Sequence, residues 1–531
     1  MKHNRLKPIA IIMALALLLA ALPALSLADG PAVWDGGVAE SYSGGSGTEN
    51  DPYLISNGSE LALLASRVNS GESTDGLYFL QTADICLNDT ANYESWSAEN
   101  APSNVWTPIG IPLYSENWEE DPVLDISLSF LGNYDGGSHT VYGLYVNKSG
   151  DDSIGAGLFG CAVAGHIENL NVECSLVIGV DSVGAIVGHN AAWISNCRNG
   201  GEVSGSWDVG GIVGSGQMGS IEFCTNSGRI TGIGNTGGIA GRLCSCSVSQ
   251  SMNSGRIEGG FQTGGIIGSL EDASASYCGN AGSVSGSQLV GGTAGNAFVS
   301  DIFACYNAGD ITGIVEGEGD EQSGFAVGGI AGWFEGHSES SYTNAVSNCY
   351  CSGNVYGSRD VGGIIGYGDV LFFIEYCYTA GNISAELNAD AIIGYSAIAT
   401  DDVIDRCLHL IIEGSAYSPY ARPVTAEELS QQNTYQFFDF DLIWTMDGSP
   451  DYPFAELQVI PHLEDISLSD GILGDADGNG SVTIADAILT MRRALDIIGD
   501  SAVIFENADM DGDGSITAAD AIMVARAALG L

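Results

Sequence analysis

The sequence predicts a mainly β protein: a right-handed parallel β-helix solenoid with a cap at each end, followed by a small all-α domain. Three observations predict this fold class. A glycine motif recurs about every 27 residues, short β-rich runs separate its copies, and two near-copies of one acidic loop lie close to the C-terminus. A fixed period of this size is typical of a solenoid, because one short repeat cannot bury an apolar face and stacked repeats can.

Residues 1–28 have the pattern of a secretory signal peptide. Three basic residues precede an apolar stretch from Ile9 to Leu22, and small residues lead to a cleavage position at Ala28. The alternative is a retained membrane anchor, but the apolar stretch is short for a spanning helix and no positive flank follows it. We therefore expect a secreted, extracellular protein without membrane insertion.

The charge of the chain limits its partners. The formal net charge is -51, and Lys148 is the only lysine after Ala28. Because nucleic acid and anionic lipid surfaces are themselves negative, we expect no nucleic acid partner and no binding to anionic membranes.

Residues 29–129 are predicted to form the N-terminal cap. The run GTENDPYLIS from Gly47 precedes a helical pattern that includes Leu61, Leu64 and Val68, and WTPIG follows at Trp106. An open solenoid end exposes unpaired strand edges that template aggregation, so a cap over the first coil is expected.

Residues 130–413 carry the repeats of the β-helix. We expect two or three short strands per period, each paired with its counterpart one coil away at a spacing of about 4.8 Å. The glycine motif, written GLFG, GGIVG or GGIAG in different copies, begins at Gly157, Gly184, Gly210, Gly237, Gly264, Gly291, Gly328 and Gly362.

Two columns of identical residues recur inside the period. Cys197, Cys224, Cys278 and Cys305 fall on multiples of 27, with Ser251 at the skipped position. A disulfide framework is the alternative for these cysteines. However, adjacent coils would separate their Cβ atoms by about the 4.8 Å strand spacing, and a disulfide needs a Cβ–Cβ distance of roughly 3.5 to 4.5 Å. We expect buried, unpaired thiols. The second column marks a bend in each coil, because asparagine tolerates left-handed backbone and stacks its amide with the next coil, and it contains Asn199, Asn226, Asn253, Asn280 and Asn307.

The glycine motif resembles the GLUG motif of large bacterial surface and secreted proteins. Two flanking runs fit that type as well, FLGNYDGGSHTVYGL from Phe130 and FDFDLIWTMDG from Phe438. The resemblance implies architecture and surface association. We expect residues 414–463 to form the C-terminal cap, with Tyr435 to Leu457 covering the last coil, and residues 464–473 to form a linker.

Two acidic loops, Asp475 to Asp486 and Asp509 to Asp520, are near-copies of each other. Oxygen-bearing side chains at positions one, three, five, nine and twelve, with glycine at position six, are typical of a loop that wraps Ca²⁺. We expect two calcium ions. The proposed ligands, with the serines contributing backbone carbonyls, are Asp475, Asp477, Asn479, Ser481, Thr483 and Asp486 in the first loop, and Asp509, Asp511, Asp513, Ser515, Thr517 and Asp520 in the second.

A helical pattern follows each loop, no comparable helix leads directly into either, and position twelve is Asp. With these features, residues 474–531 resemble the type I dockerin module, which binds the cohesin domain of a scaffold protein in cellulosome-type complexes. A calcium-buffering pair without a partner is the alternative. The resemblance implies cohesin contacts at Ile484, Ala485, Met491 and Arg492 in the first copy, and at Ala518, Ala519, Ala525 and Arg526 in the second.

No catalytic constellation is recognisable in the sequence. Asp401, Asp402 and Asp405 form the tightest acidic group, for which a solvated turn is the simpler reading. Arg229 and Arg256 recur one period apart and suit pairing with nearby glutamates or contact with an acidic sugar.

Two functions remain open for the β-helix. The first is a non-catalytic component that binds polysaccharide or cell-surface glycan. The second is a polysaccharide-degrading enzyme, an O-glycosyl hydrolase or lyase, whose active face is not recognisable; the absence of a carboxylate and base constellation favours the first. Trp193, Trp207 and Trp333 are candidates for stacking on sugars, and packing under longer turns is their alternative role.

Overall fold

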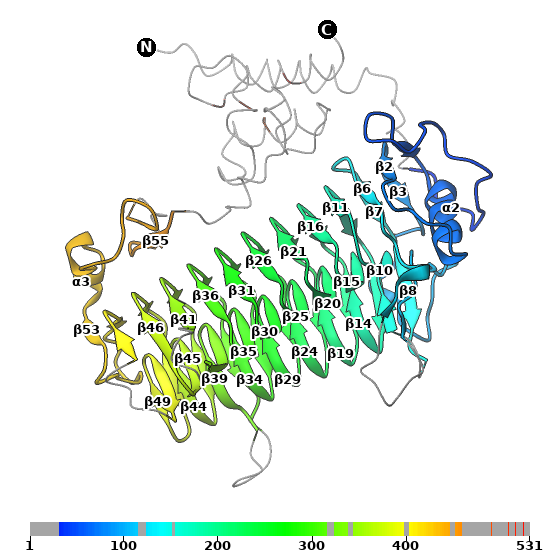
Figure 1. Ribbon diagram of the computed structural model, residues 1–531. Coiled ribbons are helices and arrows are strands. Elements are labelled where there is room, and N and C mark those ends of the chain that lie inside the picture. The colour runs from blue at the N-terminus through cyan, green and yellow to red at the C-terminus, as the bar shows by residue number, and fades with distance from the viewer. Residues whose placement is uncertain are drawn as a thin grey trace, which may run out of the picture.

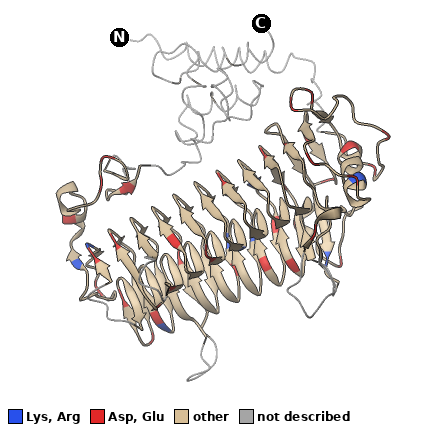
Figure 2. Cartoon of the chain, viewed as in Figure 1, with Lys and Arg blue, Asp and Glu red and all other residues tan. Residues whose placement is uncertain are grey.

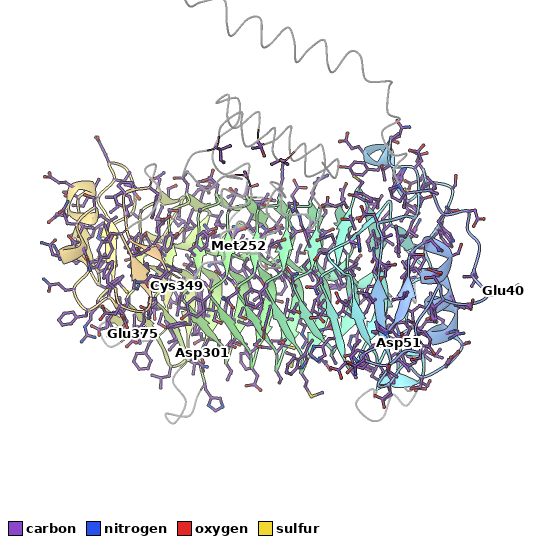
Figure 3. All side chains as sticks on the ribbon, turned by 90° about the horizontal axis from the view of Figure 1, so that it is seen from above. Glu40, Asp51, Met252, Asp301, Cys349 and Glu375 are labelled. Atoms are coloured by element: carbon purple, nitrogen blue, oxygen red, sulfur yellow. The ribbon has the colours of Figure 1, made fainter. Side chains whose placement is uncertain are left out.

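The described chain winds into a parallel β-solenoid of about twelve coils (Figure 1). The computed structural model describes residues 31–114, 124–150, 154–315, 323–337, 344–397, 403–446 and 452–458, with single positions at 490, 508, 516 and 524. Two sheets contain 12 strands and three contain 9, and strands of successive coils pair in parallel. The expected mainly β, parallel solenoid is confirmed. Seen from above, Asp51 lies near one end of the stack and Glu375 near the other (Figure 3).

Each central coil contributes one strand to each of five sheets, which we number I to V in chain order. One such coil contains β18 (Glu202–Ser204), β19 (Trp207–Gly210), β20 (Val213–Gln217), β21 (Ser220–Glu222) and β22 (Thr225–Asn226). The expectation of two or three strands per repeat was therefore wrong. Three residues with left-handed backbone, at φ of 50°, 56° and 54°, bend this coil and shorten its strands: Asp208, Met218 and Phe223.

Sheets I and IV have the following limits. Sheet I runs from β8 (Tyr145–Lys148) to β48 (Ile383–Ala385). Sheet IV runs from β1 (Tyr53–Ile55) through β2 (Tyr78–Gln81) and β6 (Asn133–Asp135) to β51 (Ile404–Asp405).

Sheets II, III and V position the sites described below. Sheet II consists of β9 (Ile154–Ala156), β14 (Asp181–Gly184), β19, β24 (Gly234–Gly237), β29 (Phe261–Gly264), β34 (Gln288–Gly291), β39 (Phe325–Gly328), β44 (Arg359–Gly362) and β49 (Ala389–Asp390). Sheet III consists of β10 (Phe159–Ala162), β15 (Val187–Asn190), β20, β25 (Ala240–Cys244), β30 (Ile267–Glu271), β35 (Ala294–Phe298), β40 (Ala331–Glu335), β45 (Ile365–Asp369) and β50 (Ile393–Ser396). Sheet V consists of β3 (Ile85–Cys86), β7 (Thr140–Tyr142), β12 (Asn171–Glu173), β17 (Arg198–Asn199), β22, β27 (Met252–Asn253), β32 (Gly279–Asn280), β37 (Tyr306–Asn307), β42 (Tyr350–Cys351), β47 (Tyr378–Thr379), β52 (Leu408–Leu410) and β53 (Arg422–Val424).

The glycine motif exists because backbone approaches backbone where sheet II turns into sheet III. In the copy GGIVG, a Cβ on Gly210 would lie 2.0 Å from the carbonyl oxygen of Val213, and one on Gly214 would lie 2.3 Å from the nitrogen of Val183. A Cβ on Gly211 would lie 2.1 Å from the carbonyl oxygen of Gly238. No side chain fits at Gly210 or Gly214 at these distances, so these two glycines recur, whereas Ala185 fills the position of Gly211 in the preceding coil. The apolar positions between them, such as Ile212, are fully buried in one continuous core.

The cysteine column lies inside this core. Cys197, Cys224, Cys278 and Cys305 are buried and unpaired, as expected. Each thiol donates a hydrogen bond to the carbonyl two residues earlier, for example from Cys224 Sγ to Glu222 at 3.3 Å. The thiols therefore act as small buried side chains that also satisfy a backbone acceptor.

The asparagine column forms a continuous amide ladder. Asn226 Nδ2 donates to Asn253 Oδ1 at 2.8 Å, and Asn253 Nδ2 donates to Asn280 Oδ1 at 2.8 Å. The amide stacking expected from the sequence is present, but the left-handed residue stands three positions earlier, as at Phe223 in the coil of Asn226. The asparagine closes its turn with its side chain instead, since its amide pairs with both the nitrogen and the oxygen of the glycine two residues later.

The N-terminal cap has the expected helix, α2 (Gly58–Asn69). The side chain of Asn57 accepts hydrogen bonds from the nitrogens of Ser59 and Glu60, which caps the helix start. Leu61, Leu64 and Val68 are buried against the core. The preceding strand β1 adds to the end of sheet IV through β2, so the cap continues the solenoid as well as covering it.

The segment from Tyr435 to Leu457 lies beside the last coils, and the expectation that it covers the open end was wrong. It includes β54 (Trp444–Thr445) and β55 (Glu456–Leu457) and packs on the outer face of sheet V, following α3 (Ala426–Leu429). There Tyr306, Tyr350 and Tyr378 stack with ring centroids 5.3 and 5.1 Å apart. This tyrosine column offers a broad aromatic surface, and Phe438 and Trp444 of the C-terminal segment are buried in one cluster with it.

The chain preceding that segment crosses the last coil. Ile383 donates from its nitrogen to Ser415 Oγ at 2.9 Å, and Ala416 donates from its nitrogen to the carbonyl of Ile383 at 2.8 Å. Ala421 joins the core cluster. These contacts cover the edge of sheet I at this end of the solenoid.

Candidate functional site

Apart from Ile516, the two acidic loops lie outside the described residues, and so do all the proposed calcium ligands and cohesin contacts. Within the helical patterns that follow the loops, Thr490 and Val524 are helical and buried. Among the described residues, no group of three or more His, Cys, Asp or Glu side chains is arranged to hold a metal ion. The calcium assignment therefore rests on the loop sequences and the family match reported below.

The remaining candidates from the sequence take different places. Asp405 is exposed and lies 3.4 Å from Arg406, while Asp401 and Asp402 lie outside the described residues. Arg229 and Arg256 both pair with Glu258, and Arg229 also lies 3.4 Å from Glu202. Arg229 is thus engaged by glutamates on both neighbouring coils and Arg256 by a glutamate on its own coil, as the pairing alternative predicted. Figure 2 shows acidic and basic residues at positions along the whole solenoid.

A polar cluster that the sequence reading missed lies where sheet II turns into sheet III. Asp208 accepts a hydrogen bond from Asn235 Nδ2 at 2.7 Å, and its burial raises the pKa of the carboxyl to about 6. Nearby, Arg242 holds Glu271 through two hydrogen bonds of 3.0 and 2.6 Å. The sequence feature that could have revealed this pair is the 27-residue step from Asp208 to Asn235, which is one repeat period. A carboxyl that is half protonated near pH 6 suits general acid chemistry. The nearby cation, Arg242, is already paired with Glu271.

The tryptophan candidates also differ from one another. Trp193 and Trp207 are 58% and 49% exposed, on sheets IV and II. Trp333 lies in sheet III, where its ring stacks on Tyr367 with centroids 4.2 Å apart and planes at 22°. Tyr367 stacks in turn on Tyr395, at 5.0 Å and 22°. Packing is therefore the main role of the Trp333 ring, because one face lies against its neighbour.

The aromatic stack ends at an open pocket on the last coil. The pocket has a volume of about 650 Å³, and its lining includes Asn388, Asp390, Tyr395, Ser396, Pro419 and Tyr420. Asp390 Oδ1 accepts hydrogen bonds from the nitrogens of Ile392 and Ile393 at 2.7 and 3.2 Å. Burial raises the pKa of this carboxyl above its ordinary value. The pocket thus combines aromatic walls with fixed polar groups, which is typical of a small-ligand site.

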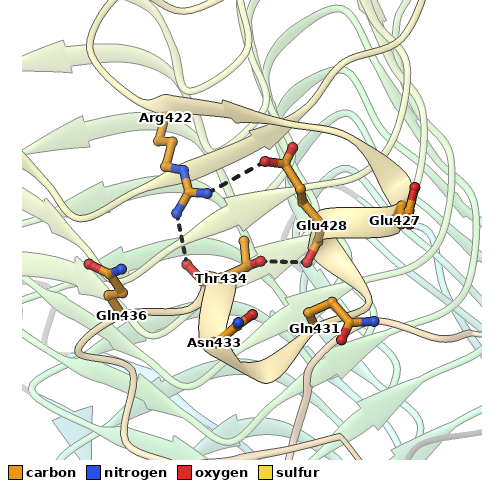
Figure 4. Close-up of a pocket in the computed structure, with 7 residues that line it drawn as sticks. All are labelled: Arg422, Glu427, Glu428, Gln431, Asn433, Thr434 and Gln436. Carbon is orange, nitrogen blue, oxygen red and sulfur yellow. Dashed lines mark hydrogen bonds and ion pairs between the residues drawn. The ribbon is translucent and has the colours of Figure 1, made fainter.

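A second pocket, of about 440 Å³, lies beside α3 (Figure 4). One of its lining residues, Arg422, lies 3.7 Å from Glu428 and donates to the carbonyl of Thr434 at 3.3 Å. Glu428 also completes the capping box with Thr425 that begins α3. The polar groups of this pocket are paired with one another, so they hold the C-terminal segment in place and leave fewer hydrogen-bonding groups for a ligand.

Comparison with known proteins identifies the C-terminal region. Residues 473–529 match the family model of the dockerin type I domain. Type I dockerins bind calcium, and a dockerin implies attachment to a cohesin domain in a cellulosome-type complex. The chain therefore joins a β-solenoid to a domain for attachment to a scaffold. Within the described ranges, no helix has both the length and the apolar character that a membrane span requires.

Two further proteins are similar to this chain over part of its length. Halomucin of Haloquadratum walsbyi is 30% identical over 177 residues, which is 33% of this chain and 2% of halomucin. The chain thus spans about 2% of the length of that curated relative. Among solved structures, a "putative immunoglobulin A1 protease" from Bacteroides ovatus is 19% identical, with a TM-score of 0.34 over 78% of this chain and 95% of that one.

Proposed function

We propose that this protein is a secreted component of a cellulosome-type complex that binds a cohesin-bearing scaffold through its dockerin, while its β-solenoid binds polysaccharide or a cell-surface glycan. The match of residues 473–529 to the dockerin type I domain carries the attachment part of this proposal. The signal-peptide pattern of residues 1–28 supports secretion, because cohesin and dockerin pairs assemble outside the cell.

The calcium chemistry follows from the loop residues. Each loop supplies four carboxylate or amide side chains together with a threonine and a backbone carbonyl, which is enough oxygen for one Ca²⁺. We assign one ion to each loop. Without metal the carboxylates repel one another, so binding of the ion stabilises the fold of the domain and the face that contacts cohesin.

A glycan is the proposed target of the solenoid because the described surface offers exposed aromatic rings on rigid stacked coils, including Trp193, Trp207 and Tyr395. The pocket at Tyr395 has the size and lining of a small-ligand site, and the excess of 66 acidic over 15 basic residues disfavours anionic macromolecules. The alternative is a polysaccharide-degrading enzyme on the same solenoid. Asp208, with its pKa of about 6, is the observation that keeps this alternative open.

Binding of the mature protein to isolated type I cohesin domains tests the attachment. We expect binding in Ca²⁺ that is lost in excess chelator and in a variant with Asp475→Ala and Asp509→Ala. Asp405→Ala, which removes an exposed carboxylate outside the loops, is the matched control and should bind normally. Unchanged binding by the double variant would refute the assignment of the loops.

A glycan array combined with a reducing-sugar assay tests the solenoid. Binding without release of reducing ends supports the non-catalytic function. Hydrolysis that is lost in Asp208→Asn would instead establish the enzyme.

A further inference from the structure

The aromatic stack of sheet III ends at Tyr395, whose outer ring face has no stacked partner among the described residues. Trp333, Tyr367 and Tyr395 occupy register positions on three successive strands, β40, β45 and β50. The middle ring, Tyr367, is covered on both faces, by Trp333 and Tyr395 at centroid distances of 4.2 and 5.0 Å, and the register partner of Trp333 on the preceding strand is Asn296. Among the described residues, β50 is the last strand of sheet III, so no further rung covers Tyr395. Tyr395 is accordingly 46% exposed.

That terminal ring lines the pocket of about 650 Å³. The pocket is also lined by Pro419 and by Tyr420, which is 41% exposed. A flat six-membered ring placed in this space would stack on Tyr395 as the next rung of the column. The roughly 4 to 5 Å spacing of the existing rungs is also the spacing at which an aromatic face contacts a ring beneath it.

The polar groups around this face suit hydroxyl-rich ligands. The backbone nitrogens of Ile392 and Ile393 fix the carboxylate of Asp390 in place, and Asn388 presents an exposed amide whose nitrogen lies 3.4 Å from Asp360 Oδ1. Carboxylates and amides accept hydrogen bonds from sugar hydroxyls, and the amide also donates. The lining contains one acidic and no basic side chain, which disfavours carboxylated or sulfated sugars.

We propose that this pocket binds one uncharged sugar ring, at the end or at a branch of a polysaccharide, by stacking on Tyr395 and hydrogen bonding to Asp390 and Asn388. This inference rests on the proposed glycan-binding function and names its site and sugar class. Recognition of a single ring follows from the stack, because Tyr367 is covered on both faces and Tyr395 is the only ring of the column that lines the pocket.

Titration of the mature protein with neutral and anionic oligosaccharides tests the site. Suitable probes are xyloglucan, mannan and cellulose oligosaccharides on the neutral side and oligogalacturonate on the anionic side, with binding followed by calorimetry. We expect Tyr395→Ala to weaken neutral-sugar binding by about tenfold or more, and Tyr395→Phe to keep most of it, because phenylalanine retains the stacking face. Tyr356→Ala is the matched control, since it removes an exposed tyrosine ring from sheet I, and should bind as the unmodified protein does.

Circular dichroism and cohesin binding of each variant show that its fold is intact. If the unmodified protein binds a neutral sugar and Tyr395→Ala binds it equally well, the site is refuted and the glycan function stands. Tighter binding of oligogalacturonate than of every neutral probe would also refute the sugar class proposed here. If the unmodified protein binds none of the probes or arrayed glycans, the glycan function and this site are both refuted.

Discussion

Replacing one asparagine in the middle of the amide ladder should destabilise the solenoid by several kilocalories per mole. Asn253 is fully buried and takes part in four hydrogen bonds. Its Nδ2 donates to the carbonyl of Gly255 at 2.9 Å and to Asn280 Oδ1 at 2.8 Å. Its Oδ1 accepts from the nitrogen of Gly255 at 3.1 Å and from Asn226 Nδ2 at 2.8 Å. The substitution Asn253→Ala removes all four together.

The magnitude follows from which partners lose their hydrogen bonds. The carbonyl of Gly255 is left in a buried turn without its amide donor, which costs about 1–3 kcal/mol. The two bonds to neighbouring coils contribute about 0.5–1.5 kcal/mol each. The expected loss is therefore roughly 2–6 kcal/mol in the free energy of unfolding. Asn199→Ala, at the start of the ladder, removes only one bond to a neighbouring coil and should cost about 1 kcal/mol less.

Guanidinium unfolding followed by circular dichroism measures both variants, and hydrogen exchange locates the change. Because coils contact mainly their neighbours, faster exchange should be confined to the coils of Asn226, Asn253 and Asn280. A loss below about 1 kcal/mol for Asn253→Ala would show that the ladder contributes little beyond ordinary surface substitutions. An equal loss for Asn199→Ala would show that the bonds between coils are not the source of the effect.

Three other predictions concern the metal, the thiols and pH. Chelation of Ca²⁺ should abolish the helical circular dichroism of the dockerin and leave the β signal of the solenoid; a dockerin that keeps its helices in excess chelator would contradict the loop assignment. Without denaturant, Cys197 and Cys278 should resist alkylation, because burial raises the pKa of both thiols well above the ordinary value, and mass spectrometry that finds either in a disulfide would refute the ladder. Asp208→Asn should raise the melting temperature more at pH 7.5 than at pH 4. The folded carboxyl has a pKa of about 6 against an ordinary 3.8, so the folded state holds a proton that the unfolded chain releases in this window, and stability falls as the pH rises from about 4 to 6. An equal or larger gain at pH 4 would contradict this sign.

The sequence predicted those features that depend on identical residues one coil apart. The glycine motif, the cysteine column and the asparagine column each repeat with the period, so stacking alone brings their members together. The number of strands per coil was not predictable in this way. The dividing residues with left-handed backbone include Met218 and Phe223, whose side chains do not mark such a conformation as glycine does.

The candidate site was harder to predict because its members come from different columns. Tyr395 and Tyr420 meet only because the chain turns back across the last coil, and Asp208 approaches Arg242 across a sharp corner between two sheets. Stacking of Trp333 on Tyr367 crosses a 34-residue step instead of the regular period, so a search at 27 residues does not find it. The packing of the C-terminal segment against sheet V was likewise hard to predict. It depends on the tyrosine column, whose three members lie at unequal steps along the chain.

The position of the C-terminal segment has a mechanical consequence. The dockerin follows this segment in the chain, so tension from a scaffold enters the solenoid through residues 435–458 before it reaches the last strand. There Trp444 donates to Asn348 at 3.1 Å, and Tyr378 donates to the carbonyl of Ala455. Both contacts lie inward from the terminal strand β53, so a pulling force is shared by two internal coils. Anchoring along the flank thus protects the outermost coil from being peeled away when the complex is under load.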